Sequence, residues 1–296
     1  MPNFAAPMQN FHELSDFMEV VMAGPQQTPN WLKEFDTKPI GITVKFKAKP
    51  EQRNAFVKAM KRHQGVTIEE EGVVGVPHFK LHTSPFDDNV FYLVEEWASA
   101  KALKKHFVAG YMGQLVDELK DILVSSSESQ TYVSLYNLGF DTLDNPQVVS
   151  PELEPTAAEP MHNFGELSEF MEVIMAGPEQ TPAWLKEFDT KPIGITVKFK
   201  AKPELRSVFV KAMKRHQKVT IQQEGVVAVP HFKLHTSPFD DHIFYLVEEW
   251  ASAEALKKHF VADYMGQLVK EMKDILVPSS ESQTYVSLYD LGFDEK

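Results

Sequence analysis

Histidines that recur in matched pairs are the first candidates for chemistry in this 296-residue chain, because imidazole gains and loses a proton near neutral pH. Eight of the eleven histidines have an identical partner 153 positions along the chain. The pairs are His63/His216, His78/His231, His82/His235 and His106/His259. We predict that His78, His82 or His106, with its partner, acts as a general base. The alternatives are a solvent-facing or interface histidine for the first two and a structural hydrogen bond between helix and sheet for His106.

The spacing of the histidines argues against a shared metal site. His78 and His82 lie four residues apart in a predicted strand, so their Cα atoms are about 13 Å apart, too far to share one ion. His63 follows two basic residues and is interpreted as a solvated helix end. The chain also has no cysteine, which excludes thiolate ligands and disulfides. We therefore predict a protein that uses neither a metal nor a cofactor.

Aromatic residues in predicted strands form the second group of candidates, for substrate binding. They are Tyr92, Trp97 and Tyr132, repeated as Tyr245, Trp250 and Tyr285. A planar aromatic ligand would stack on such rings, and the alternative is simple core packing. Glu95 and Glu96 precede the tryptophan, and strand alternation places one carboxylate on each face of the sheet. The carboxylate that faces inward would need a partner or a raised pKa.

A long internal repeat positions these residues twice. Residues 10–141 align with 163–294 without a gap, and 112 of the 132 aligned positions are identical. Between the repeats, residues 142–160 contain four prolines, four acids and no lysine or arginine, which is typical of a stiff acidic linker. The predicted organisation is a helical extension (1–38), a domain (39–141), the linker, a second extension (161–191) and a second domain (192–296).

Hydrophobic periodicity within the first domain predicts strands, helices and a fold. Apolar residues alternate through 39–49, 72–83, 89–97 and 129–138, and they recur at helical spacing through 50–70 and 99–123, with a break near Gly110. The resulting β-α-β-β-α-β order predicts an α+β, ferredoxin-like fold with one face of a four-stranded sheet left bare by the helices.

The run from Ile40 to Leu138 resembles the antibiotic biosynthesis monooxygenase family of dimeric α/β barrels. The likeness is carried by the following residues and their repeats: Glu71-Gly72, His78 to His82, Val94 to Trp97, Ala102-Leu103, His106, Tyr111 to Leu123 and Tyr132-Val133. The resemblance implies two ferredoxin-like units packed sheet to sheet as an intrachain pseudo-dimer, with further homo-oligomerisation left open. It also implies a pocket between helices and sheet, to which the tryptophan strand and the following histidine contribute.

Other classes of function lack support in the sequence. The net charge is −12, so neither nucleic acid nor an anionic membrane is an expected partner, and no stretch is apolar enough to span a bilayer. The haem-degrading branch of the fold uses an asparagine on the first strand and an axial histidine. Here 39–49 has no asparagine, and Val116 stands where that histidine would be. A cytoplasmic location is expected.

The function implied by the resemblance is cofactor-independent oxidation of an aromatic, quinol or polyketide-like small molecule. In this interpretation a histidine deprotonates the substrate, the anion reacts with oxygen, and Trp97 and Tyr92 hold the ring. The rival hypothesis is a non-catalytic ligand-binding or assembly module of the same fold.

Overall fold

The computed structural model describes residues 39–84, 86–124, 130–135, 192–237, 240–277 and 283–288, with the backbone alone for 130–135 and 283–288. Those up to residue 135 form one compact unit, and those from residue 192 form a second. The predicted helical extensions (1–38 and 161–191) and the linker (142–160) lie outside the described residues. The predicted pairing of the two units stays a prediction.

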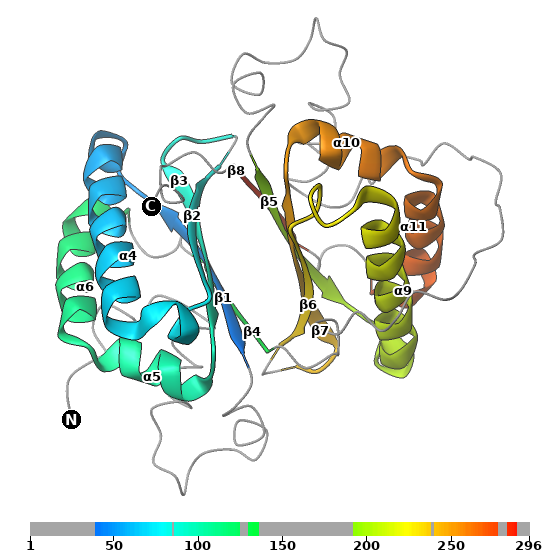
Figure 1. The fold of residues 1–296 in the computed structure, drawn as a ribbon, viewed down its shortest axis with the longest axis horizontal. Helices are drawn as coiled ribbons and strands as arrows, with labels where there is room; N and C mark the ends of the chain where they lie inside the picture. The colour runs from blue at the N-terminus through cyan, green and yellow to red at the C-terminus, as the bar shows by residue number, and fades with distance from the viewer. Residues whose placement is uncertain are drawn as a thin grey trace, which may run out of the picture. The chain divides into compact units, whose positions relative to one another are not determined.

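The first unit contains an antiparallel sheet with strand order β4-β1-β3-β2. Its strands are β1 (Ile40–Lys47), β2 (His78–Thr83), β3 (Val90–Trp97) and β4 (Gln130–Leu135). A 3-10 turn, η1 (Pro50–Gln52), leads into α4 (Arg53–Gly75), and α5 (Ala100–Val108) and α6 (Gly110–Ile122) connect β3 to β4. Figure 1 shows α4 and α6 side by side on one face of this sheet. The predicted ferredoxin-like α+β fold is confirmed.

The second unit repeats this arrangement, with strand order β8-β5-β7-β6. Its strands are β5 (Ile193–Lys200), β6 (His231–Thr236), β7 (Ile243–Trp250) and β8 (Gln283–Leu288). Its helical elements are η3 (Pro203–Leu205), α9 (Arg206–Glu224), α10 (Ala253–Val261) and α11 (Asp263–Ile275).

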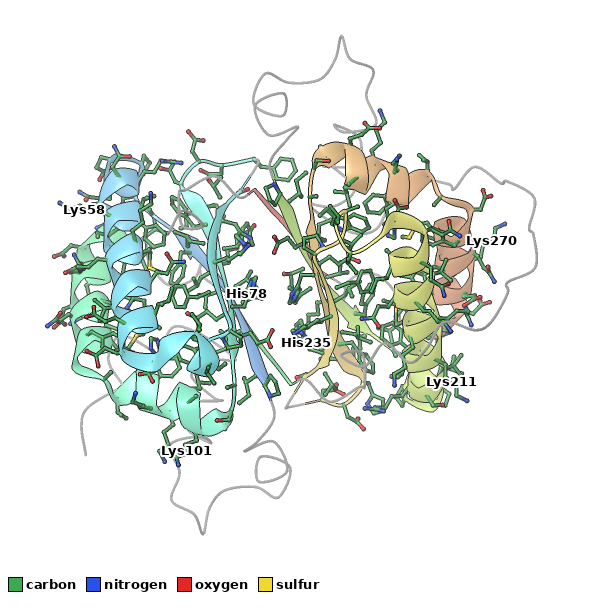
Figure 2. The ribbon with its side chains drawn as sticks, in the orientation of Figure 1. Lys58, His78, Lys101, Lys211, His235 and Lys270 are labelled. Atoms are coloured by element: carbon green, nitrogen blue, oxygen red, sulfur yellow. The ribbon has the colours of Figure 1, made fainter. Side chains whose placement is uncertain are left out.

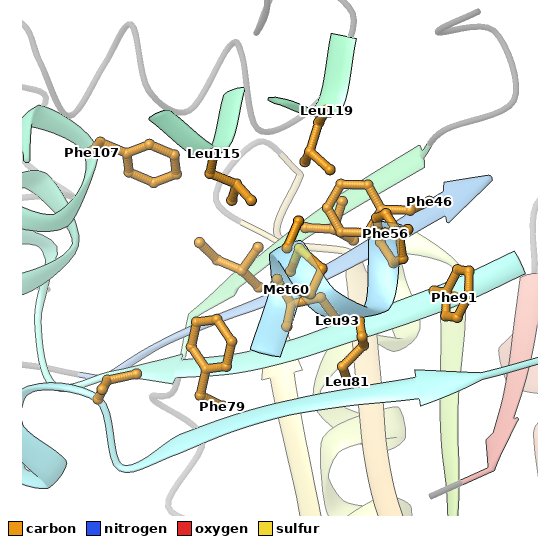
Figure 3. Close-up of a cluster of buried hydrophobic side chains, with 14 of the residues drawn as sticks. Phe46, Phe56, Met60, Phe79, Leu81, Phe91, Leu93, Phe107, Leu115 and Leu119 are labelled. Atoms are coloured by element: carbon orange, nitrogen blue, oxygen red, sulfur yellow. The ribbon is translucent and has the colours of Figure 1, made fainter. Parts of the chain in front are cut away.

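Strand alternation creates the core between sheet and helices. Apolar side chains of β1, β2 and β3 meet those of α4, α5 and α6 (Figure 3). At its centre, the ring of Phe56 on α4 lies 4.5 Å from that of Phe91 and 5.4 Å from that of Phe46, measured between centroids. Phe56 is fully buried. Burying a large aromatic side chain stabilises a fold by about 1.5–3 kcal/mol, so this contact fixes α4 on the sheet.

The start of β2 differs from the prediction, and the predicted helix break lies one residue before Gly110. Residues 72–77 do not begin a strand: Gly72 leaves the helical path with φ 71° and ψ 159°, and β2 starts only at His78. The break between α5 and α6 lies at Ala109, whose ψ of 143° is extended. The same break occurs at Ala262, where Asp263 replaces Gly110, so a glycine is not its cause.

Candidate functional site

At the end of β3, a carboxylate and an indole lie on the face of the sheet that the helices cover. Glu95 and Trp97 share the face of Phe91 and Leu93 because side chains alternate along a strand. The indole Nε1 of Trp97 donates a hydrogen bond to Oε2 of Glu95 at 2.9 Å. Trp97 is 0% exposed and Glu95 6% exposed. The prediction that Glu95 and Glu96 face opposite ways is confirmed, and Glu95 is the inward carboxylate.

Two imidazoles lie against this pair. Ser99 caps the N-terminus of α5 by accepting a hydrogen bond from the backbone N–H of Ala102, and the helix then carries His106 back over the end of β3. The ring of His106 lies 4.4 Å from that of Trp97, tilted by 38°, and 5.2 Å from that of His63. His106 is 2% exposed and His63 4% exposed. The interpretation of His63 as a solvated helix end is wrong, because His63 continues the inward stripe of α4.

A line of polar contacts joins His106 to the surface. The hydroxyl of Tyr111, in the first turn of α6, lies 2.9 Å from Nδ1 of His106 and donates a hydrogen bond to Oε1 of Glu71 at 3.0 Å. Oε2 of Glu71 pairs with Nζ of Lys105 at 2.8 Å. The side chain of Glu71 is 4% exposed and that of Lys105 62% exposed. We call the set Glu71, Glu95, Trp97, His106, Tyr111 and His63, with its counterparts, the helix-side cluster.

Burial sets the protonation of this cluster. It raises the pKa of Glu95 to about 7, against the opposing effect of the Trp97 hydrogen bond. It lowers the pKa of His63 to about 4, helped by the neighbouring Arg62 charge, and it holds the pKa of His106 well below its ordinary value. The pKa of Tyr111 is raised by burial and by its bond to Glu71. At neutral pH both imidazoles are therefore neutral, and Glu95 is the group that titrates.

The second unit reproduces the cluster almost without change. Trp250 donates to Glu248 at 3.1 Å, and the ring of His259 lies 4.4 Å from that of Trp250. Tyr264 lies 2.8 Å from Nδ1 of His259 and donates to Glu224 at 2.9 Å. His216 occupies the place of His63, with its ring 5.2 Å from that of His259. The two clusters are equivalent sites.

The remaining predicted site residues of the strands belong to the opposite face of the sheet. His78 pairs in register with Glu96, and His82 with Tyr92, so these side chains share the face that the helices do not cover. Their counterparts His231, His235 and Tyr245 pair in the same way. Figure 2 marks His78 and His235 on their sheets and Lys58 and Lys211 on the outer sides of α4 and α9. The structure thus separates His78, His82 and Tyr92 from His106 and Trp97.

Tyr132 and Tyr285 are placed by backbone register alone. Tyr132 pairs with Thr43 of β1, and Tyr285 with Thr196 of β5. Their proposed part in substrate binding stays a prediction.

Sequence reasoning missed four members of the helix-side cluster as site residues: Glu71, Glu95, Tyr111 and His63. Glu71 and Tyr111 are 40 positions apart in the chain, and only the packing of α6 on α4 brings them together. For Glu95 and Glu96, the sequence predicted that one carboxylate faces inward but did not identify which. One signal was present: Glu71, Glu95 and Tyr111 all recur at the repeat offset, as the histidines do.

One group of potential metal ligands occurs in the described part of the chain. Ligand atoms of Asp240, Asp241 and His242, in the turn between β6 and β7, lie within 4.8 Å of one another. His242 Nδ1 is 3.0 Å from Oδ1 of Asp240 and 3.1 Å from Oδ1 of Asp241. The first unit has Asn89 in the place of the histidine, so the group belongs to one unit alone.

The chain matches the family model described as antibiotic biosynthesis monooxygenase twice, over residues 39–118 and 192–271. These two segments make up more than half of the chain and contain both helix-side clusters. The chain belongs to this family, in a tandemly duplicated form.

Solved structures support the fold. A proposed monooxygenase from Fusobacterium nucleatum aligns with a TM-score of 0.59 at 14% identity, covering 86% of this chain and 93% of that one. A proposed monooxygenase from Lactobacillus acidophilus gives a TM-score of 0.55 at 12% identity, covering 86% and 97%. At these identities the likeness concerns the fold alone.

A curated relative matches a single stretch of the chain. It is an uncharacterised protein of Synechocystis sp., 26% identical over 94 residues, which are 32% of this chain and 62% of that protein. The match thus spans less than two thirds of the relative.

Among the helices that the structure describes, none is both long and apolar enough to cross a membrane. The cytoplasmic location stays a prediction.

Proposed function

We propose that each unit catalyses the cofactor-independent oxidation of a small aromatic, quinol or polyketide-like molecule at the helix-side cluster. The observation that carries the proposal is the close, tilted contact between the rings of His106 and Trp97, with centroids 4.4 Å apart, within a hydrogen-bonded cluster that both family-matched segments contain. An indole face and an imidazole side by side can hold a planar substrate and remove its proton.

The reaction balances without a cofactor. A phenol or hydroquinone loses a proton to the imidazole of His106 and becomes an electron-rich anion. That anion is oxidised by molecular oxygen: one oxygen atom enters the substrate, and the other leaves as water together with the two hydrogens that the substrate gives up. The low pKa of His106 keeps the ring neutral at neutral pH, which is the form that accepts a proton.

The helix-side cluster supports His106 as the base more directly than it supports His78 or His82. The other two histidines belong to the opposite face, away from Trp97. They remain candidates for a role on that face.

Oxygen uptake tests the proposal. Purified protein, treated with a chelator, is given a panel of phenols, hydroquinones and anthrone-like polyketides, and the product is examined for one atom from labelled oxygen gas. The double variant His106→Ala/His259→Ala should lose about 100- to 10,000-fold in kcat, the range that general-base catalysis supplies. The control Lys58→Ala/Lys211→Ala, on the outer sides of α4 and α9, should keep its activity. Full activity in the first variant would remove His106 from the mechanism.

A second candidate function is a ligand-binding module without chemistry, and one observation favours it. Trp97 is 0% exposed and His106 2% exposed, so a ligand must displace protein atoms to reach them. Ligand binding detected through tryptophan fluorescence, without any oxygen uptake across the panel, would support this function instead.

A further inference from the structure

The contacts between Glu71, Tyr111 and His106 join three helices at one point. Glu71 stands at the end of the regular part of α4, His106 in the last turn of α5 and Tyr111 in the first turn of α6. The two distances are 2.9 and 3.0 Å in the first unit and 2.8 and 2.9 Å in the second. The line is kept although residues next to it differ: Glu70 is replaced by Gln223, and Gly110 by Asp263.

The protons available along this line of hydrogen bonds determine which tautomer the imidazole of His106 adopts. A tyrosine hydroxyl carries one proton, and that of Tyr111 is donated to the carboxylate of Glu71. The oxygen of Tyr111 can then only accept from His106. Nδ1 of a neutral His106 must therefore hold the ring proton, and Nε2 must hold the lone pair.

We propose that Tyr111 and Glu71, with Tyr264 and Glu224 in the second unit, are positioning residues that lock His106 and His259 in the Nδ1–H tautomer and so make Nε2 the basic nitrogen. This inference rests on the proposed function only in giving Nε2 the role of accepting the substrate proton. The tautomer itself is a property of the free protein.

The surroundings of Glu71 explain how it stays an acceptor while buried. Lys105 pairs with Oε2 of Glu71 at 2.8 Å, and the same ammonium donates to the backbone oxygen of Glu70 at 3.1 Å. Oε1 is left for Tyr111. The cation on one oxygen and the hydroxyl on the other together offset much of the free-energy cost of burying this carboxylate.

When His106 accepts a substrate proton at Nε2, the line also stabilises the product of that step. The imidazolium then donates from Nδ1 to Tyr111, whose own hydroxyl points to the negative charge of Glu71. His63, whose ring lies 5.2 Å from that of His106, has a pKa of about 4 and stays neutral near pH 7, so it adds no opposing charge.

Nitrogen NMR of protein with labelled imidazoles tests the tautomer without any substrate. At pH 7 the wild-type protein should show, for His106 and His259, a protonated Nδ1 and an unprotonated Nε2. Tyr111→Phe removes the acceptor for Nδ1–H, and His106 should then shift towards the Nε2–H tautomer or towards a mixture. His259 in the same sample keeps Tyr264 and serves as an internal control. An unprotonated Nδ1 in the wild-type protein, or an unchanged His106 in Tyr111→Phe, would overturn the inference.

Further variants separate positioning from folding. Glu71→Gln keeps an oxygen acceptor for Tyr111, so it should retain the Nδ1–H tautomer, whereas Glu71→Ala should not. Tyr92→Phe, on the opposite face, should leave both imidazoles unchanged.

Kinetics then distinguish this inference from the proposed function. In an active protein, Tyr111→Phe/Tyr264→Phe should lower kcat by about 100-fold, the lower end of what general-base catalysis supplies, with KM little changed. The expected tautomer in a protein without oxygenase activity would leave the inference standing and reject the function. Activity with the opposite tautomer would do the reverse.

Discussion

The indole of Trp97 donates a hydrogen bond at 2.9 Å to Glu95, a carboxylate two positions earlier on the same strand and buried beneath the helices. A carboxylate in such a place is expensive to ionise, and burial raises its pKa from 4.5 to about 7. The strand therefore carries a buried group that titrates near neutral pH, so the stability of the fold should depend on pH.

The first prediction concerns Glu95 and pH. Because its folded pKa is raised, Glu95 contributes stability that is fully present below pH 4.5 and is lost as the pH rises through about 7. Glu95→Gln removes this dependence, so its free energy of unfolding relative to wild type should rise by about 3 kcal/mol between pH 4 and pH 8. Urea unfolding at several pH values measures it. Glu248→Gln should give the same curve, and a difference that does not vary with pH would contradict the prediction.

His63 should produce the opposite slope. Its folded pKa of about 4 lies below the ordinary 6.5, so its contribution to stability is present above pH 6.5 and is lost as the pH falls towards 4. His63→Phe should cancel up to about 3 kcal/mol of that acid loss. For His216 the pKa is about 3, and the loss should continue to lower pH. Unfolding midpoints of the two single variants at pH 4 and pH 7 provide the comparison.

Gly72 should not tolerate a side chain, whereas Gly65 should. The φ of 71° and ψ of 159° at Gly72 lie in a region open essentially to glycine, although no neighbouring atom would touch an added Cβ. Gly72→Ala should therefore cost about 1–3 kcal/mol from the backbone alone. Gly65→Ala, in the middle of α4 and also without a close neighbour, should stabilise by up to about 1 kcal/mol.

Chemical denaturation of both glycine variants decides between backbone strain and crowding. The second unit supports the choice of control, because Lys218 stands at the position of Gly65 while Gly225 keeps the positive φ of Gly72. Equal effects of the two alanines would show that the conformation at Gly72 is not what matters.

Phe56 should be among the most sensitive positions of the first unit. It is fully buried between Phe46 and Phe91, so Phe56→Ala leaves a cavity and should cost about 3–5 kcal/mol. The neighbouring Val57 is only partly buried, and Val57→Ala should cost less than half as much. Denaturant midpoints and thermal scans measure both variants. A Phe56→Ala protein as stable as Val57→Ala would show that this aromatic contact does not hold α4 on the sheet.

The sequence predicted most of the fold because its main signals are local. Alternation in β1 identified its inward face correctly, and the repeat identified two units. The helix-side cluster was less accessible. His63 and Thr67 extend the inward stripe of α4 beyond Phe56 and Met60, yet His63 was interpreted as a solvated helix end because two basic residues precede it. The bond between Tyr111 and Glu71 depends on how helices pack, which no periodicity reports.

Successive side chains of β3 point to opposite faces of the sheet, and this separates two sets of functional groups. Trp97 and Glu95 face the helices, while Glu96 and Tyr92 belong to the opposite face. A single residue inserted before Leu93 would turn every later side chain of the strand to the other side, moving the indole and its carboxylate out of the core. The length of β3 is therefore under tighter constraint than its composition.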